Sequence, residues 1–449
     1  MAETKLFGTD GVRGKVGEWP LDERTITRLG AAVVRSLPRH EDLSGARLLV
    51  GRDTRESGTW IEEAIARGVR SEGAWLTSAG VLPTPAVAFL TGSMEFDAGI
   101  MISASHNPYE DNGIKVFSGE GEKFDEDLEA HLEATMADQT WEVGTATGPP
   151  MERRDLVGPY LIHARTALPD LISLRRSRIV IDCANGATTT VAPRLFRELG
   201  FDVTVLHAEP DGRNINLQCG STHLDSLVSA VKAGGHRLGI AFDGDGDRCL
   251  LVDHAGGVVD GDAIMLVCAL HLKRHGELKG NTVVATVMSN IGLELALKEA
   301  GIDLVRTPVG DKHVAEAIAN RGFNLGGEQS GHVIFSDFLF TGDGIVTALN
   351  VLRVMADTGR ELADLASAFV KYPQVLVNVR VPRKVSIDDV PALSEAIAKA
   401  QASLVGHGRL LVRYSGTEPL LRIMLEGRDQ AEIHALAERL AAVAREHVK

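Results

Sequence analysis

The sequence predicts an α/β protein with three consecutive α/β domains, each with a mostly parallel mixed sheet, and a smaller C-terminal α+β domain. Three observations lead to this prediction. The chain has 449 residues, too many for one hydrophobic core. Short β-branched runs alternate with helical patterns along most of it. The last part changes to the alternation of a half-exposed strand. The expected domains span residues 1–155, 156–256, 257–370 and 371–449.

The second expected domain has the clearest α/β pattern. Apolar, β-branched runs occur at 178–182, 201–205 and 238–242, and helical stretches at 191–199 and 225–232 separate them. This β-α-β-α-β order predicts parallel strands whose faces are covered by helices.

The neighbouring domains follow the same order, although no residue-level repeat is evident. The first has expected strands at 47–50 and 98–102 around a helix at 60–71. The third has expected helices and strands at 261–272, 282–287, 293–300, 302–305, 312–319 and 323–325.

The C-terminal domain has a different pattern. Alternating valines from Val375 to Val381 predict a half-exposed strand, and runs at 410–412 and 422–425 predict two more. A helix is expected at 391–404. A last helix is expected to bury one face, formed by Ile433, Leu436, Leu440 and Val443.

Composition narrows the class of protein. Hydrophobic residues make up 44% and charged residues 24%, as in soluble globular proteins. A net charge of −14 argues against general nucleic-acid binding, but local basic groups could still bind a phosphorylated substrate. We see no secretory signal and no membrane span, and we expect a cytoplasmic protein. The scattered cysteines, with no CxxC pair, predict buried free thiols rather than disulfides or zinc ligands: Cys183, Cys219, Cys249 and Cys268.

Three aspartates with a spacing of two follow the strand at 238–242. Extended backbone would turn Asp243, Asp245 and Asp247 to one side, where they would repel one another without a hard divalent cation. A metal site is therefore favoured over a plain acidic turn. An EF-hand is excluded, because Arg248 and His254 stand where glycine and glutamate are required. A haloacid-dehalogenase-type loop is excluded because Asp247 replaces its Thr or Val.

The loop at 413–419 has the groups that bind a phosphate dianion. Ser415 and Thr417 offer hydroxyls, Gly416 offers a bare backbone N–H, and Arg413 and Arg422 flank them. This combination favours a phosphate site over an ordinary β-turn.

The loop at 326–332 reads GGEQSGH and combines an acid, an amide, a hydroxyl and an imidazole. These groups suit a polyol, whose hydroxyls donate and accept hydrogen bonds. Read alone, a polar turn is as good an interpretation. A lone histidine such as His332 is more often a structural hydrogen-bonding group than a catalyst.

Ser105 follows the buried strand at 98–102. A serine there most often caps or packs, and as a nucleophile it would need a base. Without a GxSxG elbow, acyl transfer is poorly supported. The other three loops instead indicate that Ser105 carries a phosphoryl group, with the metal between it and the aspartates. Lys115 is the expected acid or base, with a pKa lowered by burial or by neighbouring cations.

Five segments, in order along the whole chain, resemble the signatures of the α-D-phosphohexomutase family: FGTDGVRG (7–14), SASHNP (103–108), DGDGDR (243–248), GEQSGH (327–332) and RYSGTEPLLR (413–422). Further segments are similar to its bacterial phosphoglucosamine mutase branch: GRDTRESG (51–58), INLQCGSTH (215–223), VMSNIGLE (287–294) and YPQVLVNV (372–379). Lys312 and His313 stand where that branch more often has Arg-Tyr.

The resemblance implies four domains around a central active-site cleft. Ser105 would be the phosphoserine, and one Mg²⁺ would be held by Ser105 and the three aspartates. The remaining catalytic residues would be Lys115, His106, Arg13 and Arg248. The substrate would be bound by Glu328, Ser330, His332, Arg413, Ser415, Gly416, Thr417 and Arg422.

The reaction implied by the resemblance is the reversible conversion of glucosamine 6-phosphate to glucosamine 1-phosphate through glucosamine 1,6-bisphosphate. This reaction would feed the synthesis of UDP-N-acetylglucosamine and cell-wall precursors. The protein would be a monomer or homodimer that binds neither nucleic acid nor membrane. A phosphomannomutase/phosphoglucomutase is the alternative, although its sugar loop usually has Met or Glu in place of Gln329. A metal-dependent phosphatase and a non-catalytic sugar-phosphate sensor are further alternatives. The presence of Ser105, Lys115 and all three aspartates weighs against the sensor.

Overall fold

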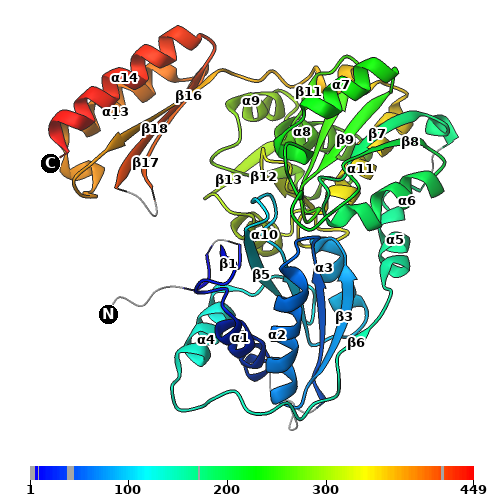
Figure 1. Ribbon diagram of the computed structural model, residues 1–449. Coiled ribbons are helices and arrows are strands. Elements are labelled where there is room, and N and C mark those ends of the chain that lie inside the picture. The colour runs from blue at the N-terminus through cyan, green and yellow to red at the C-terminus, as the bar shows by residue number, and fades with distance from the viewer. Residues whose placement is uncertain (1–5, 9, 38–44, 170–171, 416–418, 449) are drawn as a thin grey trace. The chain divides into compact units, whose positions relative to one another are not determined.

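The computed structural model describes residues 6–8, 10–37, 45–169, 172–415 and 419–448 (Figure 1). The chain divides into two compact units, residues 1–288 with 302–368 and residues 289–301 with 369–449. Three mixed sheets lie in the first unit and one antiparallel sheet lies in the second, which confirms the predicted fold class. Among the described helices, none has the length and apolar content needed to cross a membrane.

The first sheet of the larger unit has six strands, parallel in the middle and antiparallel where β5 pairs with β4 and β1. Its order is β1 (Val12–Lys15), β5 (Asp111–Ser118), β4 (Ala98–Ile102), β2 (Arg47–Arg52), β3 (Trp75–Val81) and β6 (Glu152–Arg153). The helices of this part are α1 (Glu23–Ser36), α2 (Gly58–Ser71), α3 (Thr84–Ser93) and α4 (Glu126–Ala137).

The second sheet follows the same plan with five strands. Its order is β11 (Val258–Val259), β10 (Cys249–Asp253), β9 (Leu238–Phe242), β7 (Arg178–Asp182) and β8 (Asp202–Leu206). Strand β7 pairs in parallel with β8 and β9, and β10 is antiparallel to β9. The helices of this part are α5 (Val157–Arg165), α6 (Ala192–Glu198) and α7 (Asp225–Gly234).

The third sheet has four strands, in the order β13 (Asp303–Thr307), β12 (Thr282–Thr286), β14 (Leu325–Gly327) and β15 (Val333–Phe335). The last pair is again antiparallel. The helices here are α8 (Gly261–His275), α10 (Asp311–Arg321), α11 (Gly344–Thr358) and α12 (Leu362–Ala366).

Each of these three sheets contains one direct reversal from a parallel strand into an antiparallel neighbour: β4 into β5, β9 into β10, and β14 into β15. The three reversal loops hold most of the predicted site residues of the first unit, as expected for loops beyond the carboxyl ends of strands, whereas Lys115 lies on β5 and Arg13 on β1. Strand β14 begins two residues later than predicted and includes Gly326 and Gly327. A Cβ on Gly326 would lie 2.6 Å from the carbonyl oxygen of Val284, so the strand needs a glycine there.

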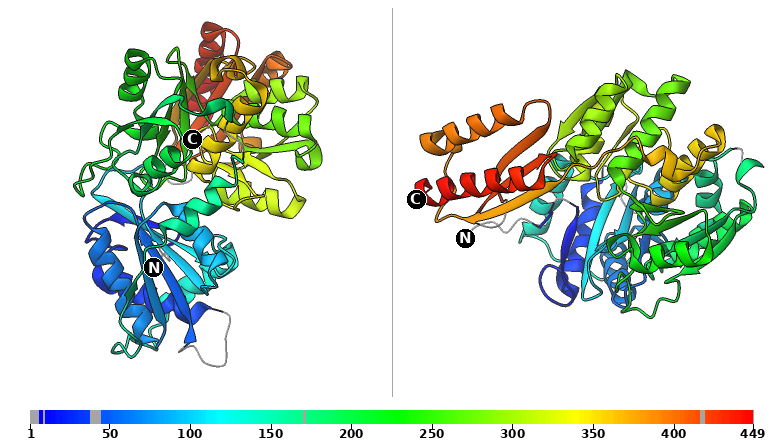
Figure 2. Two further views of the ribbon diagram at one scale, coloured as in Figure 1. Left: turned by 90° about the vertical axis from the view of Figure 1, so that its right-hand side faces the viewer. Right: turned by 90° about the horizontal axis from the view of Figure 1, so that it is seen from above.

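The smaller unit is an antiparallel sheet of β16 (Gln374–Arg380), β18 (Leu420–Gly427) and β17 (Gly408–Tyr414), with α9 (Ile291–Glu299), α13 (Pro391–Leu404) and α14 (Gln430–His447). Helices α13 and α14 run side by side along the sheet (Figure 2). Val375 and Val379 are buried and Leu376 is half exposed, which confirms the predicted alternation. Glu426, fully buried, accepts from the Ile291 N–H at 3.1 Å and from Arg409 Nε at 2.9 Å.

Helices α1 and α2 approach each other through glycines, so we expect Gly68→Ala to lower the thermal unfolding midpoint. A Cβ on Gly68 would collide with the Thr27 carbonyl oxygen and lie 2.7 Å from the Ala31 nitrogen. Because both are backbone atoms, the overpacking should cost about 1–3 kcal/mol. In the matched control Gly158→Ala, on α5, no atom lies within 4 Å of the added Cβ. That change should be neutral or stabilise by about 0.4–1 kcal/mol. Equal midpoints for the two variants would contradict the prediction.

Candidate active site

Ser105 occupies a strained and fully buried position just after β4. Its φ of 53° lies in the left-handed region, which residues other than glycine rarely adopt. The hydroxyl donates to Asp243 Oδ2 at 2.5 Å, and the Ser105 N–H donates to Ser103 Oγ at 2.9 Å. The fold therefore brings the predicted phosphoserine directly against the predicted metal loop.

Arg55 holds the backbone of the Ser105 loop through hydrogen bonds to its carbonyl oxygens. The sequence reasoning did not single out this residue. Its side chain is fully buried and Nε donates to Asp53 Oδ2 at 2.9 Å. The two terminal nitrogens donate to four carbonyl oxygens of the loop, those of Ser105 (3.0 Å), Asn107 (2.9 Å), Asp111 (3.0 Å) and Pro108. A single guanidinium thus holds the backbone of Ser105 and of the residues that follow it, as far as Asp111 at the start of β5.

Two further groups complete this support. Asp53 accepts from Ser103 Oγ at 2.6 Å, and its pKa is raised by burial although Arg55 opposes the rise. From the second sheet's loops, Asn216 Nδ2 donates to the carbonyl oxygens of Ser105 at 2.9 Å and Asn107 at 3.1 Å. These residues belong to the GRDTRESG and INLQCGSTH segments. The sequence analysis recognised both segments as motifs but did not predict that their side chains hold the Ser105 loop.

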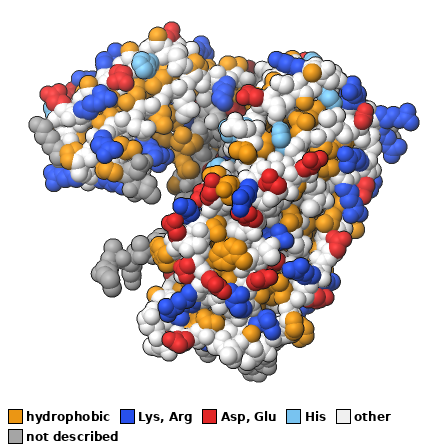
Figure 3. Space-filling view, viewed as in Figure 1, with side chains coloured by type: hydrophobic (Ala, Val, Ile, Leu, Met, Phe, Trp, Pro, Cys, Tyr) orange, Lys and Arg blue, Asp and Glu red, His pale blue; other side chains and the backbone are white. Residues whose placement is uncertain are grey.

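The three aspartates after β9 form a buried cluster of like charge. On the face of the molecule drawn in Figure 3, by contrast, acidic and basic side chains are interspersed. One oxygen from each lies within 4.8 Å of the others. Asp245 Oδ1 and Asp247 Oδ1 are buried and accept no hydrogen bond from the described residues. Burial and then the two neighbouring carboxylates raise the pKa of Asp243 well above its usual value. These oxygens without hydrogen bonds fit a hard divalent cation such as Mg²⁺.

Lys115, on β5, lies among three carboxylates. Its Nζ is 2.9 Å from Asp245 Oδ2, 3.0 Å from Asp247 Oδ2 and 3.1 Å from Asp10 Oδ2. Burial favours a lower pKa, but the carboxylates outweigh it and raise the pKa of Lys115 well above its usual value. The expectation of a lowered pKa is therefore wrong for this arrangement. A cation bound by Asp245 and Asp247 would compete with Lys115 for the same carboxylates and reduce this rise.

Asp10 is a second residue that the sequence reasoning missed, although it lies within the FGTDGVRG motif. It accepts from Lys123 Nζ at 2.5 Å and pairs with Arg13 as well as Lys115. Burial would raise the pKa of Asp10, but Lys115, Lys123 and Arg13 hold it well below its usual value. Lys123 also pairs with Asp311 of α10, so this network joins the first and third sheets.

His106, Arg13 and Arg248 lie at the open side of the cluster. His106 Nδ1 is 3.3 Å from Ser105 Oγ. Burial and then the charges of Arg248 and Arg13 lower the pKa of His106 to about 4, so the imidazole is neutral near pH 7. The Nε atoms of Arg13 and Arg248 are buried and donate to no acceptor among the described residues. Such donors suit an anionic oxygen of a ligand.

A cavity of about 470 Å³ opens beside these residues. Ser105 does not line it, but His106 and the two arginines do; the full lining is Leu6, Phe7, Gly8, Asp10, Gly11, Arg13, His106, Asp247, Arg248, Val309, Gly310, Asp311, Glu328 and His332. The reversal loop after β14 contributes Glu328, whose Oε1 accepts from the Gly310 N–H at 3.3 Å. The cavity thus combines cations with a carboxylate acceptor.

The remaining residues of this third loop are held by the protein. Ser330 Oγ donates to Glu328 Oε2 at 3.4 Å. His332 is nearly fully buried, its Nε2 accepts from the Gly342 N–H at 3.0 Å, and its Nδ1 lies 3.6 Å from Asp247 Oδ1. Burial opposes protonation of His332, but Asp247 raises its pKa. Gln329 Nε2 donates to Asp262 Oδ2 at 3.0 Å.

The unusual pair Lys312 and His313 does not line the cavity. Lys312 Nζ binds Glu129 Oε2 of α4 at 2.9 Å, and His313 Nδ1 lies 3.6 Å from Glu316 Oε2. Lys312 therefore ties the third sheet's domain to the first.

The predicted phosphate loop belongs to the smaller unit. Arg413 of β17 and Arg422 of β18 are direct partners across the antiparallel pair. Like charges directly opposite each other destabilise a sheet, and a bound anion would relieve that repulsion. Ser415 is buried and its N–H donates to the Leu420 carbonyl oxygen at 2.8 Å. Gly416 and Thr417 lie outside the described residues.

Four consecutive segments match the four domains of one family. They correspond to phosphoglucomutase/phosphomannomutase alpha/beta/alpha domain I (residues 4–142), domain II (159–257), domain III (260–372) and the C-terminal domain (376–443). Together they cover nearly the whole chain in order.

Similar curated proteins match end to end. The phosphoglucosamine mutase of Syntrophotalea carbinolica is 46% identical over 99% of this chain and 98% of its own length. That of Rhodococcus jostii is 49% identical, with 97% and 98% covered.

Solved structures share the fold. A phosphoglucomutase/phosphomannomutase family protein from Burkholderia thailandensis has a TM-score of 0.80, 24% identity, and 99% and 98% coverage of the two chains. The Aspergillus fumigatus N-acetylphosphoglucosamine mutase, solved with GlcNAc-6P and magnesium, has a TM-score of 0.70, 19% identity, and 100% and 97% coverage.

Arg55→Lys should preserve the charge beside Asp53 but lose the fork that reaches four carbonyl oxygens. We expect kcat for a hexosamine phosphate to fall by about 100-fold with little change in KM, because the Ser105 loop would shift by about 1 Å. Steady-state kinetics and the thermal unfolding midpoint should be measured together. Arg194→Lys, on the exposed surface of α6, is the control and should match the unaltered protein. Unchanged kcat in Arg55→Lys would show that Arg55 does not position Ser105.

Proposed function

The chain belongs to the phosphoglucomutase/phosphomannomutase family, and on that premise we propose that it interconverts glucosamine 6-phosphate and glucosamine 1-phosphate. The observation that carries this proposal is the contact of Ser105 Oγ with Asp243, beside two buried carboxylate oxygens that accept no hydrogen bond from the described residues. The shared name of its full-length relatives favours glucosamine over other hexoses.

Each half of the proposed reaction moves one phosphoryl group. The bond between phosphorus and Ser105 Oγ breaks, a new bond forms to the oxygen of the free sugar hydroxyl, and the proton of that hydroxyl ends on Ser105 Oγ. The product of this step is glucosamine 1,6-bisphosphate. After the bisphosphate turns around, its other phosphoryl group returns to Ser105 and the second sugar phosphate leaves.

The protein groups divide this work. Asp243, Asp245 and Asp247, with the phosphate on Ser105, would hold one Mg²⁺, which would neutralise charge on the transferring group. Lys115 is the proposed general acid and base. The surrounding carboxylates raise its pKa and so favour the protonated form, which can donate a proton. Neutral His106 would hydrogen-bond at Ser105 Oγ.

The remaining groups would bind the substrate. Arg13 and Arg248 would bind phosphate oxygens through Nε donors that make no hydrogen bond with the described residues. Glu328, Ser330 and His332 would bind sugar hydroxyls, and the loop with Arg413, Ser415, Gly416, Thr417 and Arg422 would bind the non-reacting phosphate. We further propose a cytoplasmic monomer or homodimer.

The alternative substrate preference is that of a phosphomannomutase/phosphoglucomutase. The sequence argument against this alternative rested on Gln329. In the structure the Gln329 side-chain amide donates to Asp262, so it is bound by the protein itself. Substrate competition is therefore a sharper test than this residue.

Ser105→Ala should fold and lose nearly all mutase turnover, because it removes the hydroxyl that donates to Asp243 and would carry the phosphoryl group. Ser103→Ala is the control and should lose less. Intact mass spectrometry of the unaltered protein should show a partial phosphoryl adduct that maps to Ser105. Full turnover in Ser105→Ala would refute the mechanism. A higher kcat/KM for glucose phosphate than for glucosamine phosphate would refute the substrate and leave the alternative in place.

Arg422→Ala should let the bisphosphate escape before it reorients. A charge-assisted hydrogen bond contributes about 1.5–3 kcal/mol, which corresponds to roughly ten- to a hundred-fold in residence time. Each escape leaves Ser105 without a phosphoryl group, so turnover should decay, free bisphosphate should accumulate, and added glucosamine 1,6-bisphosphate should restore the rate. Arg380→Ala, on the exposed side of β16, removes a charge from the same sheet and should turn over steadily. Slow but steady turnover of Arg422→Ala, without release or rescue, would exclude this role.

A further inference from the structure

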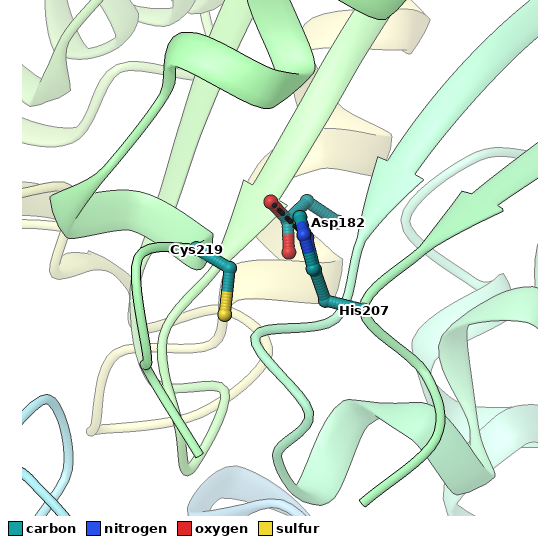
Figure 4. Close-up of side chains that lie close together, drawn as sticks. All are labelled: Asp182, His207 and Cys219. Atoms are coloured by element: carbon teal, nitrogen blue, oxygen red, sulfur yellow. Dashed lines mark ion pairs between the residues drawn. The ribbon is translucent and has the colours of Figure 1, made fainter. Parts of the chain in front are cut away.

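A second cluster of metal-binding side chains lies in the second sheet's domain, apart from the aspartate loop. Asp182 is the last residue of β7, His207 follows β8, and Cys219 precedes a short 3₁₀ turn at Gly220–Thr222. One ligand atom from each lies within 4.8 Å of the other two. Figure 4 shows the three side chains facing a common space, with His207 paired to Asp182.

We propose that Asp182, His207 and Cys219 bind a transition metal ion of the zinc class. A carboxylate, an imidazole and a thiolate together form a mixed donor set that suits zinc and not magnesium. Tetrahedral zinc would place such donor atoms about 3.3–3.6 Å apart. His207 Nδ1 is 3.0 Å from Asp182 Oδ2, and the three donor atoms all lie within 4.8 Å of one another. Three protein ligands would leave one position for water.

The hydrogen bonds around the cluster favour a ligand rather than a closed polar network. Asp182 accepts from the Ala184 N–H at 2.9 Å and the Gly220 N–H at 3.0 Å, which fixes its carboxylate. His207 Nδ1 is buried and, despite its short distance to Asp182, makes no hydrogen bond of acceptable geometry with the described residues. His207 Nδ1 is thus a buried nitrogen without a hydrogen bond, beside the fixed Asp182 carboxylate, and this is an arrangement that a metal ion could bridge.

The backbone around all three residues is strained. Five residues other than glycine have positive φ there, with values from 47° to 58°: Ala184, Asn185, His207, Asn216 and Gln218. Such conformations persist only where the surrounding structure stabilises them, and they concentrate at ligand and catalytic sites. The aspartate loop follows β9, the neighbour of β7, so both clusters lie at the carboxyl edge of one sheet.

Cys219 is inert as a free thiol. It is fully buried, and burial raises the pKa of its thiol to about 12. Because zinc binds the thiolate, uptake of the metal would release the thiol proton.

The site would support the Ser105 loop indirectly. The chain between His207 and Cys219 carries Asn216, which donates to the carbonyl oxygens of Ser105 and Asn107. A metal ion that ties both ends of this segment to β7 would hold Asn216 in place. This inference concerns a separate set of side chains and does not depend on the proposed function.

Cobalt is the probe for the test, because a cobalt–thiolate bond absorbs strongly in the near ultraviolet whereas cobalt on carboxylates or imidazoles does not. The full chain, first stripped with chelator, should gain this absorption with one Co²⁺ per chain and lose it when Zn²⁺ is added. Cys219→Ser should abolish it. The matched control Cys268→Ser, another buried free cysteine, should retain it. Asp245→Asn should also retain it, which separates this site from the aspartate loop.

The proposal fails if the unaltered chain shows no cobalt–thiolate absorption, or if the absorption persists in Cys219→Ser. Circular dichroism should confirm that each variant folds. If Cys219→Ser does not fold, His207→Gln decides, because this side chain is 30% exposed and tolerates replacement more readily. Cobalt–thiolate absorption of unchanged intensity and affinity in His207→Gln would overturn the three-ligand site.

Discussion

The burial of three carboxylates around Lys115 is the constraint on which the larger unit depends. Removing such groups from water costs several kcal/mol each unless cations offset it. Lys115 comes from β5, whereas Asp245 and Asp247 come from the loop after β9, so this charge pairing joins two sheets. Lys123, paired with Asp10 and Asp311, extends it to the third. The three sheets therefore cannot separate without leaving buried charge unpaired.

The same arrangement explains how the backbone at Ser105 can stay fixed while the ion pairs around the three aspartates change. Arg55 and Asn216 hold the Ser105 loop through backbone carbonyl oxygens, and neither touches the three aspartates. The position of Ser105 is thus fixed by groups that take no part in the charge balance. The side-chain cations can be redistributed when a metal ion or a phosphate enters, because the backbone that carries the nucleophile is held separately.

Local patterns in the sequence predicted much of this structure, and contacts distant in sequence account for the rest. Strands at 98–102, 178–182 and 238–242 and the helix at 391–404 have the predicted bounds. Helix α11, most of whose residues are buried, was not predicted. The spacing of two revealed the aspartates, but nothing local shows which carbonyl oxygens Arg55 reaches. The Lys115 pKa was misjudged because Asp10 approaches it from 105 positions away in the chain.

The reversal from a parallel into an antiparallel strand is common to the three sheets of the larger unit, and it supplies three different chemical groups at corresponding places. A serine follows β4, aspartates follow β9 and a glutamate follows β14. The second sheet carries further ligands at the same edge, after β7 and β8, and Asn216 connects that edge to the serine loop. The carboxyl edge of the second sheet therefore acts on Ser105 twice. It acts through the side chain of Asp243 and through the backbone contact of Asn216, and an ion bound at Asp182, His207 and Cys219 would strengthen the second.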